Sequence, residues 1–379
     1  MSRTLVIDPD PSGHRAFYLA LIADALGIER IQLMVPGGHQ HLCDCFARRG
    51  MDLNEFTIIP TDSHDNQTLI TEAAKISKER LCSNVLFAYL DGCIGELLSH
   101  EGQFSCSVSG IWFHPYALDP IYRWLPPVDK RSRHRRLIHH ALRRQSSRLK
   151  IGHLFFLDPA ATKRISKVNP TIQATTLPDP WEKLPELDQR EARSRFDLPR
   201  EKFIFLHIGS SEKRKGLGDA LRAFQQVAAD PAISKRILLL RVGENKRLGK
   251  TARILLDELT AQKMVQRVDE FVSEADFMEY FSAADWVLLP YRKFRYSSGI
   301  FANAIAADKP MIASDYGMIG KNVRENRCGL LFRHQSINDL ARTIRLALDS
   351  DPPTIDPSIR DRWHPNRFIA ELRSALLTQ

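Results

Sequence analysis

Short apolar runs alternate with longer stretches of helical periodicity along the chain of 379 residues. Short apolar runs predict buried strands, and apolar residues three or four positions apart predict helices. In the first half, helical spacing covers residues 16–26 and 68–81, each between apolar runs. The strands predicted there are residues 5–8, 31–35, 56–60, 85–90, 108–114 and 154–157.

A second alternating series follows a polar, proline-bearing stretch that ends near Glu201 and is typical of a linker. The predicted strands are 203–208, 237–242, 268–272, 286–290, 311–314 and 330–332, and the predicted helices are 218–228, 251–262, 274–282, 300–307 and 337–348.

Strands that alternate with helices predict parallel sheets with helices on both faces, which is the α/β class. The break near the middle predicts two Rossmann-like domains, residues 1–178 and 202–352, joined by a linker at 179–201. Helical spacing within residues 353–379 predicts a C-terminal segment that packs back towards the first domain. Because parallel sheets bind ligands beyond the carboxyl ends of their strands, we expect the active site in a cleft between two facing domains.

A cluster of cations follows a glycine at the carboxyl end of the predicted strand 203–208. Gly209 and Ser210 lead into Arg214 and Lys215, just before a predicted helix. Backbone N–H groups, the helix dipole and these cations would together bind a phosphate. The spacing is not that of a Walker loop, and an ordinary turn with solvated lysines has the same local pattern.

A serine pair precedes the predicted helix 300–307. Ser297, Ser298 and Gly299 come after the predicted strand 286–290 and a basic stretch. Serine hydroxyls at a helix start either cap the helix or help its N–H groups to hold an anion. Two loops of this kind at one sheet edge predict a clamp for a diphosphate.

The ordered motifs between Gly209 and Phe332 resemble the carboxyl-terminal domain of GT-B glycosyltransferases, in particular the family-four (group 1) enzymes that use nucleotide-sugar donors. Each motif alone is weak, but the order is fairly specific. The resemblance implies a GT-B architecture and a hexosyltransferase-type enzyme that moves a sugar to a glycan or lipid-linked acceptor in polysaccharide or glycolipid biosynthesis. The matching pieces are residues 209–216, 271–273, 283–291, 297–299, 306–314 and 328–332.

The resemblance also implies a donor site and two catalytic residues. Lys215 would be one of them, and His114 the other, because relatives often have a histidine near the transferred sugar at this strand end. From the local pattern alone, His114 is equally well explained as a hydrogen-bonded histidine at a strand end. The residues expected to bind the donor diphosphate are Gly209, Ser210, Arg214, Lys215, Ser297, Ser298 and Gly299.

Further positions would contact the rest of the donor, or the acceptor. Val272 and Asn303 are expected at the nucleoside. Gly13, His14 and Arg295 are expected at the donor or the acceptor. The loop after the first strand, which holds Gly13 and His14, approaches both in the family, and Arg295 could contact a phosphate or an acidic group. A lone loop histidine such as His14 is also common as an exposed residue without a role.

Three positions depart from the family pattern. Relatives usually have an arginine where this chain has Ser210, and they often have glutamates where it has Arg295 and Asn303. Asn303 can still hydrogen-bond a ribose diol, whereas Arg295 introduces a cation where the sugar is expected. These departures keep an alternative open, namely a non-catalytic GT-B-like scaffold or binding subunit.

The implied chemistry needs no metal and no cofactor besides the nucleotide-sugar substrate. Negative charge builds on the departing diphosphate, and Lys215 with helix N–H groups would stabilise it. No acidic pair suited to a metal is evident, since Asp8 and Asp10 flank a proline and are interpreted as a turn. Retention of the anomeric configuration is implied by the resemblance alone.

The net charge of +9 is concentrated in one segment. From Lys130 to Lys150 there are nine lysines or arginines and no acid, so the other 358 of the 379 residues sum to zero. Leu137, Ile138 and Leu142 make this segment an amphipathic helix. It suits an anionic membrane surface, an acidic acceptor or a solvated face. Nucleic acid is not expected as a partner, because no aromatic platform accompanies the charge.

Composition and termini predict a cytoplasmic protein, and the basic segment leaves open a peripheral position at the inner face of the membrane. With 43% hydrophobic and 26% charged residues, the chain is not collagen-like, wholly disordered or a disulfide scaffold. It opens with no secretory signal and has no apolar run long enough to span a bilayer. No Cys or His pair at zinc spacing follows Cys43 and Cys45, so reduced thiols are expected.

Overall fold

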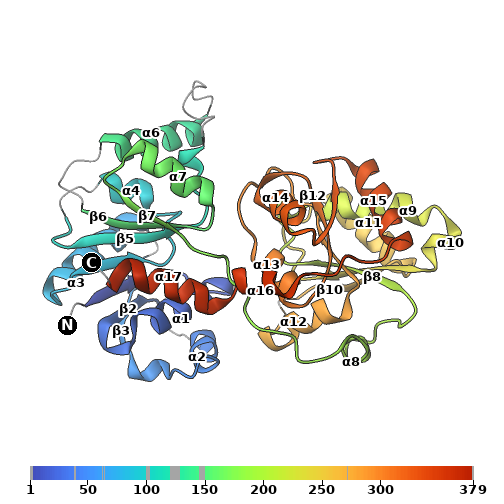
Figure 1. Cartoon of the computed structure of the whole chain (residues 1–379), viewed down its shortest axis with the longest axis horizontal. Helices are drawn as coiled ribbons and strands as arrows, with labels where there is room; N and C mark the ends of the chain where they lie inside the picture. Colours follow the sequence, from blue (N-terminus) through green and yellow to red (C-terminus); the bar gives the residue numbers. More distant parts are fainter. Residues whose placement is uncertain are drawn as a thin grey trace. The chain divides into compact units, whose positions relative to one another are not determined.

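The computed structural model of the chain is shown in Figure 1. The structure describes residues 3–37, 40–61, 63, 65–99, 103–119, 129–144, 150–270 and 272–377. It divides into two compact units. The first unit consists of Met1–Pro178 with Pro365–Gln379, and the second of Asp179–His364.

The first unit contains a sheet of seven parallel strands in the order β3-β2-β1-β4-β5-β6-β7. Two of the strands end two or three residues earlier than the sequence predicts, because the chain turns away after Phe87 and after Trp112. The polar edge strand β7 was missed, since its residues lack an apolar run. The strands are β1 (Thr4–Ile7), β2 (Ile31–Val35), β3 (Thr57–Pro60), β4 (Asn84–Phe87), β5 (Ser107–Trp112), β6 (Ile151–Phe156) and β7 (Gln173–Thr176).

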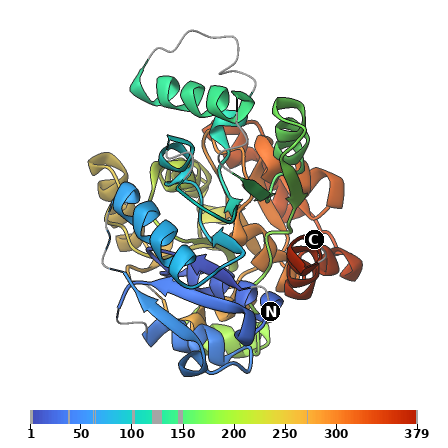
Figure 2. The same cartoon turned by 90° about the vertical axis from the view of Figure 1, so that its left-hand side faces the viewer.

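Each face of the first sheet has its own hydrophobic core. Successive side chains of a strand point to opposite faces, so Leu5 and Ile7 of β1 join one core and Val6 joins the other. The helices cover both faces, as Figure 2 shows from the side. They are α1 (His14–Leu26), α2 (Gln40–Ala47), α3 (Asn66–Glu79), α4 (Ile94–Ser99), α6 (Lys130–Arg144), α7 (Pro159–Val168) and α17 (Pro365–Leu377), with short 3-10 turns at Ile28–Arg30, Leu53–Glu55 and Tyr116–Leu118.

The last helix, α17, belongs to the first unit, although residues 179–364 separate it from the rest of that unit. Phe368 packs on Tyr18 of α1 with the ring centroids 5.4 Å apart. Arg373 donates a hydrogen bond of 2.8 Å to the carbonyl oxygen of Ala25 at the end of α1. Residues 353–364 belong to the second unit instead, so the C-terminal segment is shared between the two.

The second unit contains six parallel strands in the order β10-β9-β8-β11-β12-β13. One strand was predicted out of place at 268–272. Val265 pairs with Leu239 and Val268 with Val242, so the ladder is complete before residue 269. The strands are β8 (Phe203–Ile208), β9 (Ile237–Val242), β10 (Val265–Val268), β11 (Trp286–Leu289), β12 (Met311–Ser314) and β13 (Gly329–Phe332).

The segment predicted as a linker, 179–201, is part of the second unit. Asp188 and Glu191 form a capping box, in which each side chain accepts a hydrogen bond from the backbone of the other, and this starts a helix at residue 189. The helices of this unit are α8 (Gln189–Arg195), α9 (Leu217–Ala228), α10 (Pro231–Ser234), α11 (Lys250–Ala261), α12 (Glu274–Ala283), α13 (Gly299–Ala306), α14 (Gly317–Asn326), α15 (Ile337–Asp349) and α16 (Pro357–Arg362), with a 3-10 turn, η4, at Lys213–Lys215.

The two sheets confirm the predicted α/β class with two Rossmann-like domains. In each sheet, the first strand of the unit lies between the second and the fourth, so the strand order reverses beside it. Ligands of such sheets bind beyond the carboxyl ends of the strands at this switch point. In the second unit, it lies between β8 and β11.

Candidate functional site

The loops that follow β8 and β11 meet at the switch point of the second sheet. The backbone N–H of Arg292 donates a hydrogen bond of 2.8 Å to the carbonyl oxygen of Arg214. Gly216 has φ +73°, and a Cβ there would lie 1.8 Å from the carbonyl oxygen of Pro290. Only glycine allows this close approach, so the sequence Lys215-Gly216 fixes one loop against the other.

A chain of three polar side chains joins the two loops. Lys215 is 9% exposed, and its Nζ donates a hydrogen bond of 2.5 Å to the hydroxyl of Tyr291. That hydroxyl lies 2.9 Å from Oγ of Ser298, and Nζ lies 4.5 Å from the centre of the Tyr291 ring. No carboxylate pairs with Lys215 within the described residues. Its charge is therefore buried among neutral groups, which suits it to an anion from outside.

The start of α13 offers N–H groups to the same place. Ser298 is the N-cap residue, but its side chain makes no capping hydrogen bond, since it bonds to Tyr291 instead. Oγ of Ser297 donates a hydrogen bond of 2.6 Å to the buried carboxylate of Asp179. Of the two roles predicted for the serine pair, Ser298 does not perform the capping role. The first N–H groups of the helix, beginning at Gly299, remain as donors.

Gly209 brings the β8 loop close to the lysine. It has φ +115°, and a Cβ there would lie 3.9 Å from Nζ of Lys215. The next residue, Ser210, is exposed. The predicted diphosphate residues Gly209, Lys215, Ser298 and Gly299 are thus brought together at one sheet edge.

Arg214 is engaged within its own loop. Its Nε donates a hydrogen bond of 2.6 Å to Glu212, and its guanidinium lies 4.8 Å from the centre of the Phe294 ring. Burial alone would raise the pKa of Glu212, but Arg214 and Arg247 together lower it below its usual value. Arg214 therefore shares its charge with a carboxylate, unlike Lys215.

Arg295 lies beside two aromatic rings that the sequence analysis missed. Its Nε donates a hydrogen bond of 2.6 Å to the hydroxyl of Tyr316, and the Tyr316 ring stacks on His334 at 4.3 Å. Burial lowers the pKa of His334. Ser314 bonds to the other side of this imidazole, at 2.8 Å. Arg295, Tyr316 and His334 follow β11, β12 and β13, while Ser314 ends β12. Each is isolated in the sequence, so no spacing could reveal the cluster.

The two residues predicted at the nucleoside have different surroundings. Asn303 is 1% exposed, and its Oδ1 accepts a hydrogen bond of 3.0 Å from the backbone N–H of Glu182. It thus anchors the segment that the sequence analysis treated as a linker. Val272 is half-buried and lies beyond the end of β10, which stops at Val268.

In the first unit, His114 forms a pair with Asp91. Nδ1 of His114 lies 3.0 Å from Oδ1 of Asp91, and this carboxylate also accepts hydrogen bonds from the backbone N–H groups of Phe113 and His114. His114 therefore lies beyond β5, held by a residue that follows β4. Asp91 was not among the predicted site residues.

The loop after β1 is organised by an ion pair. Asp8 is 1% exposed and binds Arg15, which also reaches Asp10. Burial raises the pKa of Asp8, although Arg15 acts in the opposite direction. Gly13 has φ +53° and precedes α1, whose first residue, His14, contacts the edge of the Tyr18 ring at 4.9 Å. The two acids therefore form the turn that the sequence predicts.

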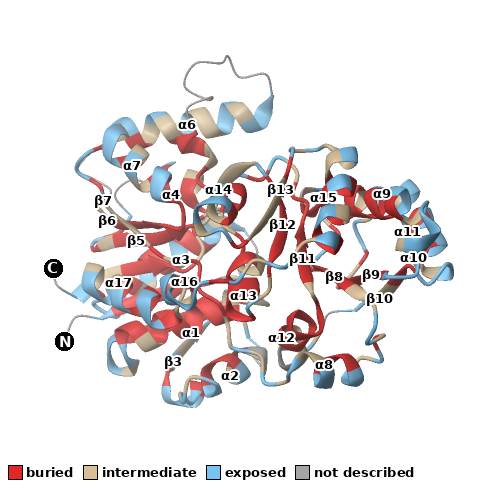
Figure 3. Ribbon diagram, turned by 45° about the vertical axis from the view of Figure 1, so that its right-hand side comes forward, coloured by how far each residue is buried: buried red, intermediate tan, exposed pale blue. Residues whose placement is uncertain are grey.

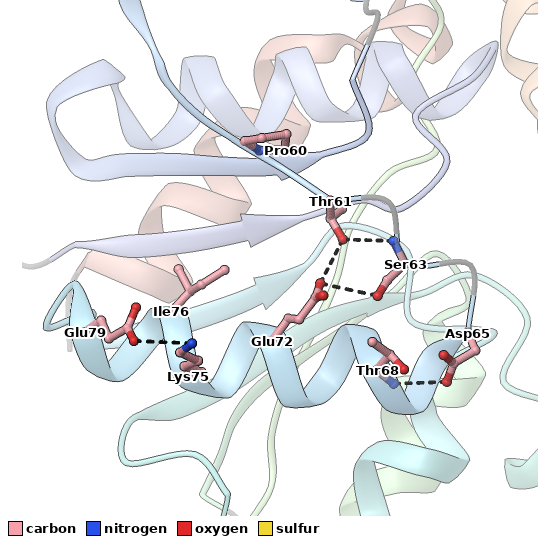
Figure 4. Close-up of a pocket in the computed structure, with 9 residues that line it drawn as sticks. All are labelled: Pro60, Thr61, Ser63, Asp65, Thr68, Glu72, Lys75, Ile76 and Glu79. Carbon is pink, nitrogen blue, oxygen red and sulfur yellow. Dashed lines mark hydrogen bonds and ion pairs between the residues drawn. The ribbon is translucent and has the colours of Figure 1, made fainter.

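A groove lies between the end of β3 and α3, as Figure 4 shows. Glu72 accepts hydrogen bonds of 3.0 Å from Thr61 and 3.3 Å from Ser63, and Lys75 pairs with Glu79 at 3.9 Å. Its charged groups are thus engaged with one another. None of the predicted site residues lines it.

The basic helix α6 presents most of its cations to solvent. Ile138 and Leu142 are buried against the first unit, while Leu137 is 67% exposed. Figure 3 shows the exposed residues along most of this helix. The rest of the predicted basic segment, at 145–149, lies outside the described residues. Those of its cations that the structure shows as exposed are Lys130, Arg131, Arg133, Arg143, Arg144 and Lys150.

The described residues contain neither a metal-ligand cluster nor a membrane-spanning helix. No group of three or more His, Cys, Asp or Glu side chains among them could hold a metal ion. None of the helices described combines the length and the apolar character that a bilayer crossing requires. The six cysteines are all free thiols.

Comparison with known sequences identifies the second unit. Residues 188–366 match the family described as "Glycosyl transferases group 1". The second unit is a group 1 glycosyltransferase domain. Among curated proteins, this chain is 25% identical over 208 residues to D-inositol 3-phosphate glycosyltransferase 1 of Catenulispora acidiphila. That match covers 52% of the chain and 46% of the relative, so the similarity spans less than half of the relative's length.

Solved structures resemble this chain over its whole length. Anabaena HepE in complex with UDP has a TM-score of 0.73 at 13% identity and covers 100% of both chains. WaaG, a glycosyltransferase involved in lipopolysaccharide biosynthesis, has a TM-score of 0.63 at 16% identity, with 99% of this chain and 95% of WaaG covered. These likenesses confirm the predicted GT-B fold.

Proposed function

We propose that this protein transfers a sugar from a nucleoside-diphosphate donor to a glycan or lipid-linked acceptor. The observation that carries the proposal is the chain from Lys215 through Tyr291 to Ser298, at the switch point of the second sheet. It places a buried ammonium group and a helix N-terminus at one edge, which are the groups that a diphosphate needs. The similarity to HepE, solved with UDP, supports a uridine diphosphate donor.

The proposed reaction needs stabilisation of a departing diphosphate. As the glycosidic bond to the donor breaks, negative charge accumulates on the leaving oxygen. Lys215 and the N–H groups at Gly299 would stabilise that charge in place, without reorganisation. We propose that the reaction uses no metal and retains the anomeric configuration, and that His114, held by Asp91, contacts the transferred sugar.

The direct test is binding followed by turnover. Calorimetry with UDP, ADP, GDP and TDP should show one of them binding, and that diphosphate should raise the melting temperature, because a ligand of the folded state stabilises it. The matching nucleotide sugars are then tested for release of the diphosphate with lipid-linked and free glycan acceptors. Absence of binding to all four diphosphates would remove the basis of the proposal.

A non-catalytic GT-B-like scaffold is the second candidate. It is favoured by Ser210, Arg295 and Asn303, where relatives have arginine and glutamates, and by the use of Asn303 to anchor Glu182. The scaffold would bind a nucleoside diphosphate without releasing one from any nucleotide sugar. Turnover with any donor, abolished by Lys215→Ala, eliminates it.

We further propose that α6 contacts an anionic membrane surface, which would bring the enzyme to a lipid-linked acceptor. Each cation near such a surface contributes about 1 kcal/mol. Replacing Arg133 and Arg143 by Glu should release the protein from phosphatidylglycerol vesicles, while Lys78→Glu with Arg80→Glu, which reverses two exposed charges at the end of α3, should not. Equal binding of wild type to phosphatidylcholine vesicles would contradict an electrostatic contact.

A further inference from the structure

An arginine is buried in the middle of the second sheet. Arg241 lies in the otherwise apolar strand β9 and is 0% exposed. Burial of a charge is costly unless hydrogen bonds compensate for it. The guanidinium is surrounded by oxygen acceptors from the ends of β8 and β9 and from the loops that follow them. They are the carbonyl oxygens of His207, Gly209, Val242 and Glu244 and Oδ1 of Asn245.

The charge of Arg241 has no direct carboxylate partner in the part of the chain that the structure describes. The nearest link is indirect: Asn245, which accepts from Arg241, donates a hydrogen bond of 2.5 Å to Asp269. Burial lowers the pKa of Arg241 to about 10. The side chain therefore stays protonated at neutral pH, and its charge is balanced mainly by carbonyl dipoles.

Arg241 fixes the direction of a peptide group in the loop after β8. Its Nη1 donates a hydrogen bond of 2.7 Å to the carbonyl oxygen of Gly209. In a trans peptide, the N–H of the next residue points opposite to that carbonyl. Drawing the Gly209 carbonyl inward thus turns the Ser210 N–H outward, to the side where an anion would bind.

The loop after β9 is packed beneath the same carbonyl group. Gly243 has φ +116°, and a Cβ there would lie 2.5 Å from the carbonyl oxygen of Gly209. This glycine keeps the space that the hydrogen bond from Arg241 needs. His207, the cross-strand partner of Arg241, holds the other end of the β8 loop, since its Nε2 lies 3.1 Å from the carbonyl oxygen of Lys215.

We propose that Arg241 is a positioning residue of the donor site, which holds the Gly209 loop with the Ser210 N–H outward and supplies positive charge from beneath it. The inference rests on the proposed binding of a diphosphate at that loop. It accounts for the absence of an arginine at position 210: Ser210 contributes only its N–H, and the cation lies one strand away and buried. Lys215 then acts from the open side of the loop and Arg241 from the buried side.

The test compares ligands that differ only in charge. Wild type and Arg241→Gln are titrated with UDP, uridine and inorganic pyrophosphate by calorimetry. We expect Arg241→Gln to weaken the binding of UDP and of pyrophosphate on the order of tenfold, while the binding of uridine is unchanged. The reason is that a charge acts across several ångströms in a protein interior. Adding Ser210→Arg to Arg241→Gln should restore UDP affinity, because it returns the charge on the open side.

A second buried arginine provides the control. Arg193 is 6% exposed and donates hydrogen bonds to the carbonyl oxygens of Ala283 and Arg200 and to Asp285, away from the loop. Arg193→Gln should lower the melting temperature without changing the ratio of UDP to uridine affinity. A merely structural role for Arg241 would give the same result in both variants.

The outcomes separate the inference from the function on which it rests. If wild type binds neither UDP nor pyrophosphate, the proposed donor site is wrong. If wild type binds them and folded Arg241→Gln binds them equally well, Arg241 has no role in the site. Should Arg241→Gln fail to fold, Arg241→Lys decides: it keeps a charge but lacks the planar fork, and we expect about threefold weaker UDP binding. An unchanged ratio of UDP to uridine affinity in Arg241→Lys overturns the inference.

Discussion

The carboxyl edges of the two sheets have the same topology but handle charge in opposite ways. In the first unit, Asp8 binds Arg15 directly and Asp91 binds His114 directly. In the second unit, Lys215 bonds to a tyrosine hydroxyl and Arg241 to carbonyl oxygens. One edge pairs its charges internally, whereas the other buries two cations among neutral groups.

The difference supports our proposal that the edge of the second sheet binds an anion. An ion pair that is satisfied within the protein gains little from a ligand, and its removal leaves a buried charge without a partner. A cation held by neutral dipoles keeps most of its attraction for an external phosphate. We therefore propose that the diphosphate binds to the second unit and that the first unit supplies hydrogen bonds through His114.

The largest expected effect comes from removing Lys215, the cation that we propose to contact the diphosphate at the edge of the second sheet. Lys215→Ala should weaken UDP binding on the order of a hundredfold, or about 2.7 kcal/mol, because a charge-assisted hydrogen bond to phosphate is lost. Lys213→Ala, two residues earlier and exposed, is the control and should change affinity little. Calorimetry at two salt concentrations measures both. Equal losses in the two variants would show that only the general charge of the loop matters.

The next expected effect is on the stability of the fold, through His207, which lies beside the buried Arg241. Burial and Arg241 lower the pKa of His207 to about 3, below the value of about 6.5 in the unfolded chain. The unfolded state therefore binds the proton first, and stability is lost as pH falls from about 6.5 towards 3. Between pH 7 and pH 5, this residue should cost the folded state about 2 kcal/mol.

His207→Gln is the variant that tests this. Glutamine can still donate to the carbonyl oxygen of Lys215 but does not titrate, so the variant should lose less stability between pH 7 and pH 5 than wild type. Urea unfolding at both pH values provides the measurement. A parallel decline in the two proteins would place the acid sensitivity elsewhere, for example at His153, whose pKa burial lowers to about 4.

Alternation of apolar runs was sufficient to predict most of the fold. Residues 31–35, 203–208, 237–242 and 311–314 form strands with the predicted bounds. The strand β7 was missed because Gln173–Thr176 lies at an edge and needs no apolar run. The strand β10 was misplaced because its register depends on the pairing of Val265 with Leu239, which the local sequence does not contain.

The candidate site was predictable only where residues adjoin in the chain. Gly209 to Lys215 and Ser297 to Gly299 are local motifs, and the sequence pointed to both loops. Arg241 stands in an apolar strand, where the pattern indicates only burial. Asp91 becomes meaningful only when the sheet brings it to His114, 23 residues away in sequence.

The histidine pair gives a smaller effect, on turnover alone. The Asp91 carboxylate holds three groups: the backbone N–H groups of Phe113 and His114, and Nδ1 of His114. Asp91→Asn leaves one acceptor oxygen for them, so the imidazole of His114 loses its fixed orientation. We expect kcat to fall about tenfold, or about 1.4 kcal/mol, with UDP binding unchanged. Asp158→Asn is the control, since Asp158 follows β6 at the same sheet edge and accepts a backbone N–H.

A double variant distinguishes positioning from a separate role. If Asp91 acts only through His114, then Asp91→Asn should cause no further loss in a His114→Ala background, because residues in contact are not additive. Additive losses would mean that Asp91 acts on the substrate by itself.

The smallest expected effect tests how Ser298 and Tyr291 hold Lys215 in place. Ser298→Ala removes the hydrogen bond of 2.9 Å to Tyr291, while Tyr291 keeps the one from Lys215. A single neutral hydrogen bond contributes about 0.5–1.5 kcal/mol, so UDP binding should weaken about threefold. Ser282→Ala removes a bond of 2.9 Å from an equally buried serine to the carbonyl oxygen of Leu187, away from the loops, and should leave affinity unchanged. A loss in Ser298→Ala as large as in Lys215→Ala would mean that the tyrosine bridge, rather than the ammonium charge, organises the site.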